Sequence, residues 1–228
     1  MKKKVAVLTG AGMSADSGLK TFRDADGLWE GHDVMEVASP QGFRAHPELV
    51  LEFYNERRRQ LLEVQPNDGH KALVELEEKF EVQIITQNVD DLHERAGSQN
   101  VLHLHGELFK ARSTVPPYTV YDWRKDLNLG DCCDLGNQLR PHIVWFGEEV
   151  PLLPHAAELT SQAEILIIVG TSLQVYPAAS LMYYARPGIP IYFVDPRPSL
   201  TNSGELNLYL IAQKASEGVP ELVSSLLQ

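Results

Sequence analysis

The 228-residue sequence predicts an α/β fold: a parallel sheet with helices on both faces, and a small loop-rich lobe made of two insertions. Three observations predict this class. Short apolar runs alternate with segments of helical periodicity, which is typical of parallel sheets covered on both faces. Glycine or polar residues directly follow these runs, as they do where strands end at a ligand site. Two stretches, about 20–66 and 106–146, interrupt the alternation and are expected to form the small lobe.

The first half of the chain contains two expected strands and two expected helices. The apolar run at about 4–9 predicts a buried strand, and residues 20–46 are expected to be irregular because glycine and proline punctuate them. Apolar residues at helical spacing predict a helix over 47–64, and a second amphipathic helix is expected over 70–80. The run 82–86 predicts the next strand.

The second half continues the alternation after one interruption. Residues 107–141 contain a Pro-Pro pair and scattered charges, and we expect them to lack regular structure. Apolar runs and helical periodicity predict further elements: strands at about 101–105, 165–169 and 189–194, and helices at about 155–163 and 219–227.

Composition and charge exclude several protein classes. The formal net charge is −11 without a basic stripe, which argues against nucleic acid as the main partner. No apolar run approaches the length of a membrane span, and the run after Met1–Lys4 ends at Gly10, too early for a signal peptide. Two adjacent cysteines, Cys132 and Cys133, cannot form a disulfide framework. We therefore expect a cytoplasmic protein that binds no membrane; its oligomeric state is unknown from sequence.

The turn after the first strand satisfies a loose dinucleotide-binding pattern, Gly10-x-Gly12-x-x-Ala15. Glycines let the backbone approach a bound phosphate, and Ser14–Ser17 is expected to begin a helix whose N–H groups face an anion. The same spacing also occurs in ordinary tight turns. No strand ending in an acidic residue follows about 20 residues later, so a dehydrogenase is disfavoured. We expect a Rossmann-like lobe over about 1–19, 67–105 and 147–228.

Five expected strands end next to glycine or polar residues. These residues are Gly10, Gln87, His105, Gly170 and Asp195. Because ligands bind at the carboxyl ends of parallel strands, we expect the five positions to form one shared site. A substrate chain would enter through the cleft between the two lobes.

Six sequence blocks occur in a specific order along the chain. They are GAGMSADSG from residue 10, TFRDADGLW from 21, TQNVD from 86, LHGE from 104, VWFGE from 144 and VGTSL from 169. In this order they resemble the sirtuin family of NAD-dependent protein deacylases over roughly residues 4–216, within a single catalytic domain spanning 1–228. The resemblance implies NAD as co-substrate and acylated lysine side chains of proteins as partners, with nicotinamide and O-acyl-ADP-ribose as products.

His105 is the expected general base, because histidine titrates near neutral pH and this one lies at the predicted site. In the sirtuins that the chain resembles, the matching histidine takes a proton from the nicotinamide-side ribose. The alternative is a structural histidine that bonds a loop carbonyl. His103 shares the same strand face and is expected in the core or behind the site.

Asn88 and Asp90 follow a strand, and an amide with a carboxylate suits the carboxamide of nicotinamide. The alternative is an Asx turn that closes the strand. Arg23 is placed for phosphate or ribose contact, with a solvated charge as the alternative. The resemblance implies cofactor contacts for Gly10, Ala11, Gly12, Ser14, Ala15, Gly18, Thr21, Phe22, Arg23, Trp29, Gln87, Asn88, Asp90, His105, Gly170, Thr171, Ser172, Asp195, Pro196, Arg197 and Ala215.

Substrate binding is expected at two places. The backbone of the substrate is expected to add a strand to Val144–Glu148, with Val144, Phe146 and Gly147 in contact. Tyr54 and Arg57 share an otherwise apolar helix face, so Arg57 should face an anion rather than solvent. The alternative is that Arg57 is one solvated member of a run of three arginines. The pair resembles the Tyr-x-x-Arg signature of sirtuins that remove succinyl and malonyl groups.

The chain departs from the family at the metal. Most sirtuins carry two cysteine pairs for structural zinc, whereas residues 107–141 offer only Cys132 and Cys133, with Asp131 and His142 as other possible ligands. A closed structural site needs four ligands, so we expect no structural zinc and no metal ligand. We expect apolar packing to replace it, from Tyr118, Tyr121, Trp123 and Leu127.

The leading hypothesis is an NAD-dependent protein-lysine deacylase that removes succinyl, malonyl and acetyl groups. The alternatives are an NAD hydrolase or ADP-ribosyl transferase on the same cofactor, and an NAD-sensing module. The presence of His105, Asn88 and Asp90 argues against a sensor.

Overall fold

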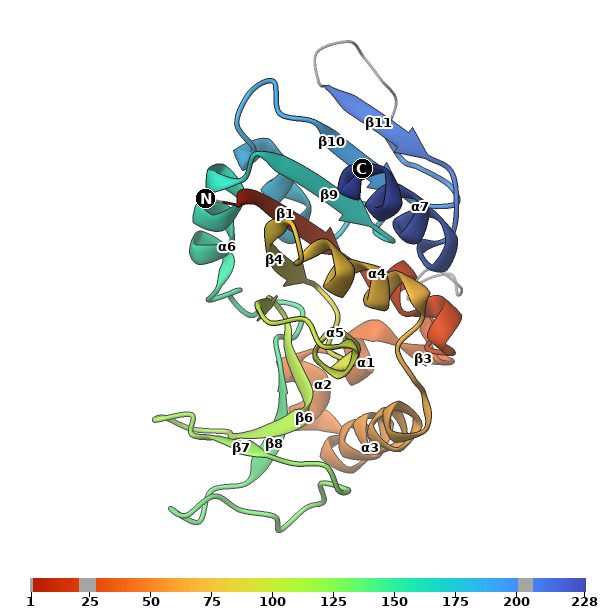
Figure 1. Ribbon diagram of the computed structural model, residues 1–228. Helices are drawn as coiled ribbons and strands as arrows, with labels where there is room; N and C mark the ends of the chain where they lie inside the picture. The colour runs from red at the N-terminus through yellow and green to blue at the C-terminus, as the bar shows by residue number, and fades with distance from the viewer. Residues whose placement is uncertain (1, 21–27, 201–206) are drawn as a thin grey trace.

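The computed structural model describes residues 2–20, 28–200 and 207–228 of the chain (Figure 1). Within these ranges, six strands form a parallel sheet in the order β11-β10-β9-β1-β4-β5. The strands are β1 (Lys3–Thr9), β4 (Phe80–Thr86), β5 (Val101–His103), β9 (Ile165–Val169), β10 (Ile191–Val194) and β11 (Leu208–Ile211). β1 pairs with β4 on one side and β9 on the other, so the strand order reverses at β1. Ligands bind at such switch points in parallel sheets.

Helices cover both faces of this sheet, because alternate strand residues point to opposite faces. Val5 and Val7 of β1 pack on one side, with α4 (Asp68–Leu76) and α7 (Ala215–Leu227). Ala6 and Leu8 pack on the other, with α6 (Leu153–Gln162) and the 3₁₀ helix η4 (Ala178–Tyr184). The predicted α/β fold class is confirmed.

A second group of elements lies beyond the carboxyl ends of β1 and β4 (Figure 1). It has its own core, built on Val50, Phe53, Leu61 and Trp145. Its helices are α1 (Val34–Val37), α2 (Pro40–Ala45) and α3 (Pro47–Glu63). Among the described residues, its strands form the antiparallel sheet β7-β6-β8 and a hairpin: β6 (Gly106–Ser113), β7 (Val120–Asp122), β8 (Leu139–Ile143), β2 (Leu28–Trp29) and β3 (His32–Asp33). The short helices η1 (Ala11–Met13), η2 (Ala15–Ser17) and α5 (Leu92–Ala96) complete the described elements.

Two stretches expected to be irregular contain regular structure. Within 20–46, α1 and α2 form because Asp33 and Ser39 cap them, their side chains accepting from the N–H groups of Met35 and Gly42. Within 107–141, β6 buries the neighbouring Leu108 and Phe109 in the core that it shares with α3, and its charged residues are only partly buried. Two ends and one strand also differ from expectation: the strand expected over 101–105 stops at His103, α7 begins at residue 215, and β11 was not predicted.

Across the described residues, no helix is both long enough and apolar enough to cross a bilayer.

Candidate active site

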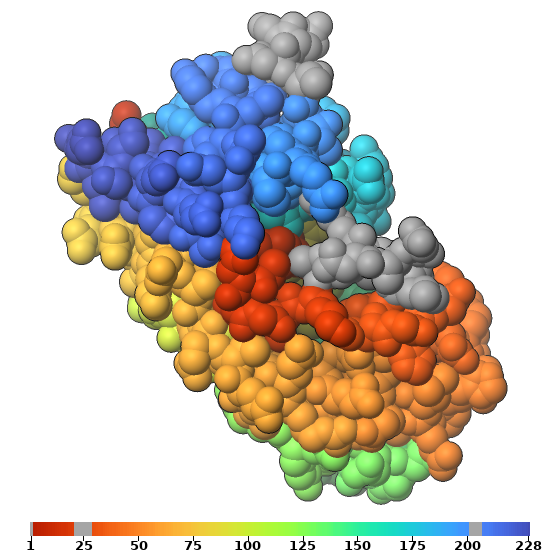
Figure 2. All heavy atoms as spheres, turned by 90° about the vertical axis from the view of Figure 1, so that its right-hand side faces the viewer, coloured from red at the N-terminus to blue at the C-terminus, as the bar shows by residue number. Residues whose placement is uncertain are grey.

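One cavity of about 510 Å³ lies at the carboxyl ends of β1, β4, β9 and β10. Its wall is built from both groups of elements: the loops of the parallel sheet on one side, and α3 with the residues after β8 on the other. Figure 2 shows residues 11–20, in red, between the blue C-terminal elements and the orange helices of the second group. The site predicted from the strand ends is therefore one cavity, with Gly10, Gln87, His105, Gly170 and Asp195 all in its wall.

The glycine loop after β1 packs backbone against backbone on the loop after β9. The Gly12 N–H donates to the Gly170 carbonyl at 2.8 Å, and a Cβ on Gly12 would lie 2.7 Å from the Gly170 Cα. Gly170 has a φ of +60°, and a Cβ there would lie 2.3 Å from the Met13 nitrogen. Only glycine fits this close approach. The expected helix after the loop is instead the pair of short 3₁₀ turns η1 and η2, so no long helix directs its N-terminus at the cavity here.

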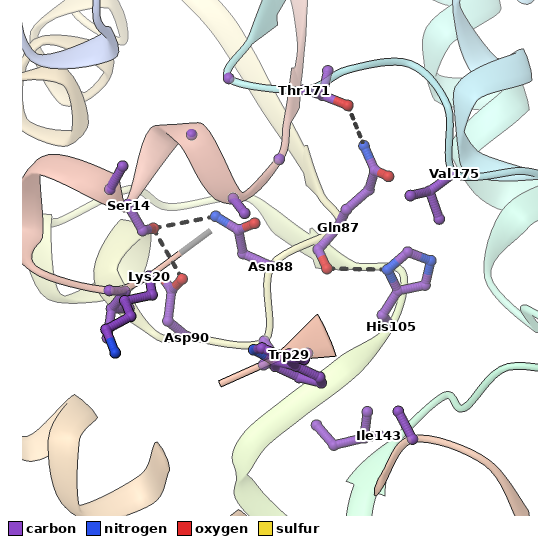
Figure 3. A pocket seen from close by; sticks show the side chains of 18 of the residues that line it. Ser14, Lys20, Trp29, Gln87, Asn88, Asp90, His105, Ile143, Thr171 and Val175 are labelled. Carbon is purple, nitrogen blue, oxygen red and sulfur yellow. Dashed lines mark hydrogen bonds between the residues drawn. The ribbon is translucent and has the colours of Figure 1, made fainter. Parts of the chain in front are cut away.

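Ser14 joins the glycine loop to the loop after β4 (Figure 3). Its hydroxyl donates to Asp90 Oδ2 at 2.9 Å and accepts from Asn88 Nδ2 at 3.2 Å. Asp90 Oδ1 also accepts from the Leu92 N–H at 3.2 Å, so the Asx turn is present as well. Burial raises the pKa of Asp90, despite the hydrogen bond from Ser14. The amide and carboxylate expected at this position are held together in the cavity wall.

His105 lies after β5, and its Nδ1 is 3.0 Å from the Gln87 carbonyl oxygen (Figure 3). A carbonyl only accepts, so Nδ1 carries the proton and donates it. Burial lowers the pKa of His105, so the ring is neutral at pH 7. In this tautomer Nε2 is the acceptor. Gln87 is itself fixed, since its Nε2 donates to Thr171 Oγ1 at 3.3 Å. A bond to a loop carbonyl was the contact expected if His105 were only structural. Here that bond orients the ring of a histidine that lies in the cavity wall.

His103 supports the site from behind, as expected. It is buried, its Nδ1 donates to the Asn88 carbonyl at 3.1 Å, and its Nε2 donates to Glu94 Oε1 at 2.7 Å. Burial opposes the charged form, yet Glu94 raises the pKa of His103 overall. Glu94 thus fixes the ring of His103, and His103 holds the Asn88 carbonyl; neither residue lines the cavity.

Most expected cofactor residues line the cavity, and a few do not. Thr171, Ser172, Pro196 and Arg197 are in its wall, with Ala11, Ala15 and Trp29. Gly18 has a φ of +99° and caps η2, and Ala215 is buried at the start of α7; neither lines the cavity, where Lys214 is found instead. Thr21, Phe22 and Arg23 lie outside the described residues.

The segment Val144–Glu148 lines the cavity as a turn after β8, and not as a strand. The N–H groups of Val144 and Phe146 donate to the carbonyls of His105 and Ala38, both at 2.9 Å. Glu148 accepts from the Trp145 N–H at 2.8 Å and from Arg140 at 2.7 Å. A substrate strand was expected to pair with this segment. Because the N–H groups of Val144 and Phe146 already donate within the protein, mainly the carbonyl groups of the segment are left for such a strand.

Tyr54 and Arg57 of α3 both reach the cavity. The Tyr54 hydroxyl accepts from Trp145 Nε1 at 2.9 Å, and burial raises the pKa of the phenol. Arg57 Nη1 donates to the Phe53 carbonyl at 2.6 Å, and its guanidinium lies 3.7 Å from the centre of the Phe53 ring. Its Nε is buried without a hydrogen-bond partner. Arg57 therefore still has an N–H group that can donate to a bound anion.

Two members of the arginine run point inward, Arg57 as expected and Arg58 in addition. Arg58 is 1% exposed and donates to the Leu108 carbonyl at 3.1 Å, and burial lowers its pKa to about 10. Arg59 is the solvated member and pairs with Glu52. Arg57 is the one that lines the cavity.

The cysteine region packs as an apolar cluster. Cys133 is buried with Leu51, Leu127 and Leu139, and Tyr121 and Trp123 pack against them. Tyr118 is 52% exposed, so its expected packing role is wrong. Cys132 is exposed. No group of three or more histidine, cysteine or acidic side chains gathers as a metal site in the part of the chain described.

Sequence reasoning missed several residues in the cavity wall: Lys20, Glu30, Ile143, Val175, Tyr176 and Pro177. None of the six gave a pattern that distinguishes it from ordinary loop residues. Even Glu30-Gly31 differs from the Asn-Gly, Asp-Gly and Gly-Gly pairs that mark a two-residue hairpin turn.

The chain matches known proteins over nearly its full length. The model of the Sir2 family matches residues 10–177. An NAD-dependent protein deacylase of Helicobacter pylori (strain ATCC 700392 / 26695) is 58% identical over 226 residues, which is 99% of this chain and 98% of the relative. An NAD-dependent protein deacylase of Bacteroides thetaiotaomicron is 50% identical over 231 residues, covering 99% and 98%.

Solved structures agree with this similarity. A Sir2 homologue in complex with NAD superposes with a TM-score of 0.88 at 39% identity, covering 99% of this chain and 90% of that one. A Sir2 variant with a deacetylated p53 peptide and 3′-O-acetyl ADP-ribose superposes with a TM-score of 0.81 at 30% identity, covering 98% and 94%.

Proposed function

This chain belongs to the Sir2 family, and from that premise we propose that its cavity binds NAD beside an acylated lysine. The chain is an NAD-dependent protein deacylase, and NAD is its co-substrate. What remains to be assigned is which residues hold NAD, which one moves the proton, and which acyl group the site prefers.

The residues present fit NAD. Gly10 and Gly12 pack closely on Gly170 and Thr171, and between them only the small Ala11 side chain lies in the cavity wall, so the loop backbone can lie close to a pyrophosphate. Asn88 and Asp90 would hold the carboxamide of nicotinamide, and Thr171 and Ser172 would hold the adenosine side. When bound, NAD supplies an electrophilic ribose carbon from which nicotinamide leaves.

His105 would take the proton. The observation that carries this assignment is its fixed tautomer: Nδ1–H donates to Gln87, so Nε2 has the lone pair. Because burial lowers its pKa, the neutral form prevails at pH 7. The rate should therefore be level from pH 7 upward and fall only below about pH 6.5, the ordinary histidine value.

The acyl group would be a short dicarboxylic one, succinyl or malonyl, in preference to acetyl. Arg57 supports this, since its buried Nε has no partner and its charge lies beside the cavity. A carboxylate could accept from Nε and Nη2 together. Tyr54, fixed by Trp145, would donate its hydroxyl proton to the same carboxylate. A pocket that binds the acyl group in this way favours acyl-lysine over water as the group that attacks the ribose carbon of NAD. It therefore favours deacylation over NAD hydrolysis.

Replacing His105 with alanine tests the assignment of the base. Turnover on an acyl-lysine peptide should fall by about 100-fold or more, while NAD affinity measured by calorimetry stays within a few-fold. The matched control is His155→Ala, since His155 is 56% exposed on α6, away from the cavity; its turnover should equal wild type. Near-normal turnover of His105→Ala would show that another group moves the proton.

A further inference from the structure

Glu30 places a second carboxylate in the cavity beside Arg57. Its side chain is 14% exposed and lines the same cavity. Glu30 Oε2 accepts from Lys20 Nζ at 2.8 Å and lies 3.9 Å from Arg57 Nη2. The chain thus provides an anion of its own at the position where an acidic acyl group would pair.

The backbone that presents Glu30 is unusual. Glu30 and Gly31 form the two-residue turn between β2 and β3, and their φ angles are +52° and +84°. Two positive φ angles are typical of the type I′ hairpin turn, whose first position favours asparagine, aspartate or glycine. Glutamate there costs conformational free energy, and backbone outliers of this kind gather at functional sites. The turn holds the carboxylate inward.

Arg57 is only partly satisfied by its protein contacts. Nη1 donates to the Phe53 carbonyl and to Glu56 Oε2, the latter at 2.9 Å. Nε is buried without a partner, and the 3.9 Å to Glu30 exceeds a hydrogen bond. Glu30 therefore balances the charge of Arg57 without occupying its donors.

We propose that Glu30 is a specificity-determining residue, an internal counter-charge that lets one pocket accept both neutral and acidic acyl groups. This proposal rests on the assignment of Arg57 to the acyl pocket. With an acetyl group bound, Glu30 balances the charge of Arg57 from inside the cavity, where the methyl group would lie, whereas Glu56 pairs with Arg57 from the exposed side. With a succinyl group bound, Glu30 and the acyl carboxylate share Arg57, and their repulsion weakens binding. Lys20, paired with Glu30, moderates that repulsion.

Glu30→Gln tests the proposal, because it removes the charge and keeps the shape. The succinyl KM should fall and the acetyl KM should rise, with kcat changing less. The ratio of kcat/KM for succinyl over acetyl peptides should rise by about fivefold to tenfold. The matched control is Glu56→Gln: Glu56 also pairs with Arg57, but it is 54% exposed and does not line the cavity. Its ratio should stay at the wild-type value, as expected of a solvated pair.

A second variant separates charge from turn geometry. Glu30→Asn removes the carboxylate but suits a positive φ, so the hairpin should be retained and the ratio should rise as for glutamine. Thermal unfolding of both variants checks the fold. An unchanged ratio, or an equal loss on both peptides, would overturn the role of Glu30 while leaving the acyl pocket standing. A wild-type enzyme with no activity on the succinyl peptide would instead overturn the acyl-pocket assignment, and the proposal with it.

Discussion

Replacing each of three consecutive arginines with methionine should give three different results, because α3 directs them to three environments. Arg57 lines the cavity, Arg58 is buried against Leu108, and Arg59 pairs with Glu52 in solvent. The substitution is chemically the same in each case. Only the position of the side chain differs, so each variant is a control for the others.

Arg57→Met should lose activity on succinyl-lysine peptides. Two donors, Nε and Nη2, are available for a carboxylate, and charge-assisted hydrogen bonds contribute about 1.5–3 kcal/mol each. The competing charge of Glu30 reduces this contribution. The loss of transition-state binding in Arg57→Met should therefore be about 2–5 kcal/mol, which is a fall in kcat/KM of about 30-fold or more. Activity on acetyl-lysine peptides should change less than about threefold, because the acetyl group carries no carboxylate to accept from Arg57.

Arg58→Met should destabilise the fold by about 1–3 kcal/mol, since the Leu108 carbonyl loses its partner. Arg59→Met should match wild type in stability and in both activities, as expected of an exposed pair. Chemical unfolding measures the stability of the three variants, and peptide kinetics measures their activities on succinyl-lysine and acetyl-lysine. Equal loss of succinyl and acetyl activity in Arg57→Met would contradict the reasoning, because it would mean that Arg57 supports the fold or NAD.

Three further predictions concern His70, Gly170 and structural zinc. Burial lowers the pKa of His70 to about 4 in the folded state, so the unfolded state binds more protons than the folded state between that pH and about 6.5. The free energy of unfolding should therefore fall by up to about 3 kcal/mol as the pH falls across this range. Urea unfolding of His70→Gln should show a shallower pH dependence than that of the wild type. Gly170→Ala should weaken NAD binding and destabilise the fold by about 2 kcal/mol or more through contact with Met13, whereas Gly188→Ala, at φ +83° in open space, should leave NAD affinity unchanged by calorimetry. Elemental analysis should find less than stoichiometric zinc, and a chelator should leave the melting temperature unchanged; one zinc per chain would contradict this.

The parallel sheet could be predicted from sequence because its strands are buried on both faces. β9 is a continuous apolar run, fully buried, and was predicted with its observed bounds. The helix α3 was predicted to within one residue, since Val50, Tyr54 and Leu61 lie at helical spacing and are all buried. The sheet of the second group could not be predicted in the same way. In β6, Glu107, Lys110 and Arg112 interrupt the apolar residues, because one face packs on α3 and the other is partly exposed.

The site was predictable where it follows from strand ends. A parallel sheet brings its carboxyl ends together whatever the loops do, so Gly10, Gln87 and His105 could be placed in one cavity. The acyl side depends on contacts between residues far apart in the chain. Glu30 meets Arg57 through a hairpin turn with positive φ, and no local pattern indicates that pairing. Helical periodicity placed Arg57 on the inward face with Tyr54, but it gave no indication that Arg58 is buried as well.

Mass spectrometry of an acylated peptide, incubated with the enzyme with and without NAD, tests the central claim most directly. The proposal predicts that a succinyl-lysine peptide loses its acyl group only when NAD is present, with one nicotinamide and one O-succinyl-ADP-ribose formed per lysine released. An acetyl-lysine peptide should react in the same way but more slowly. Nicotinamide release with the peptide left intact would instead identify an NAD hydrolase, and would contradict the account.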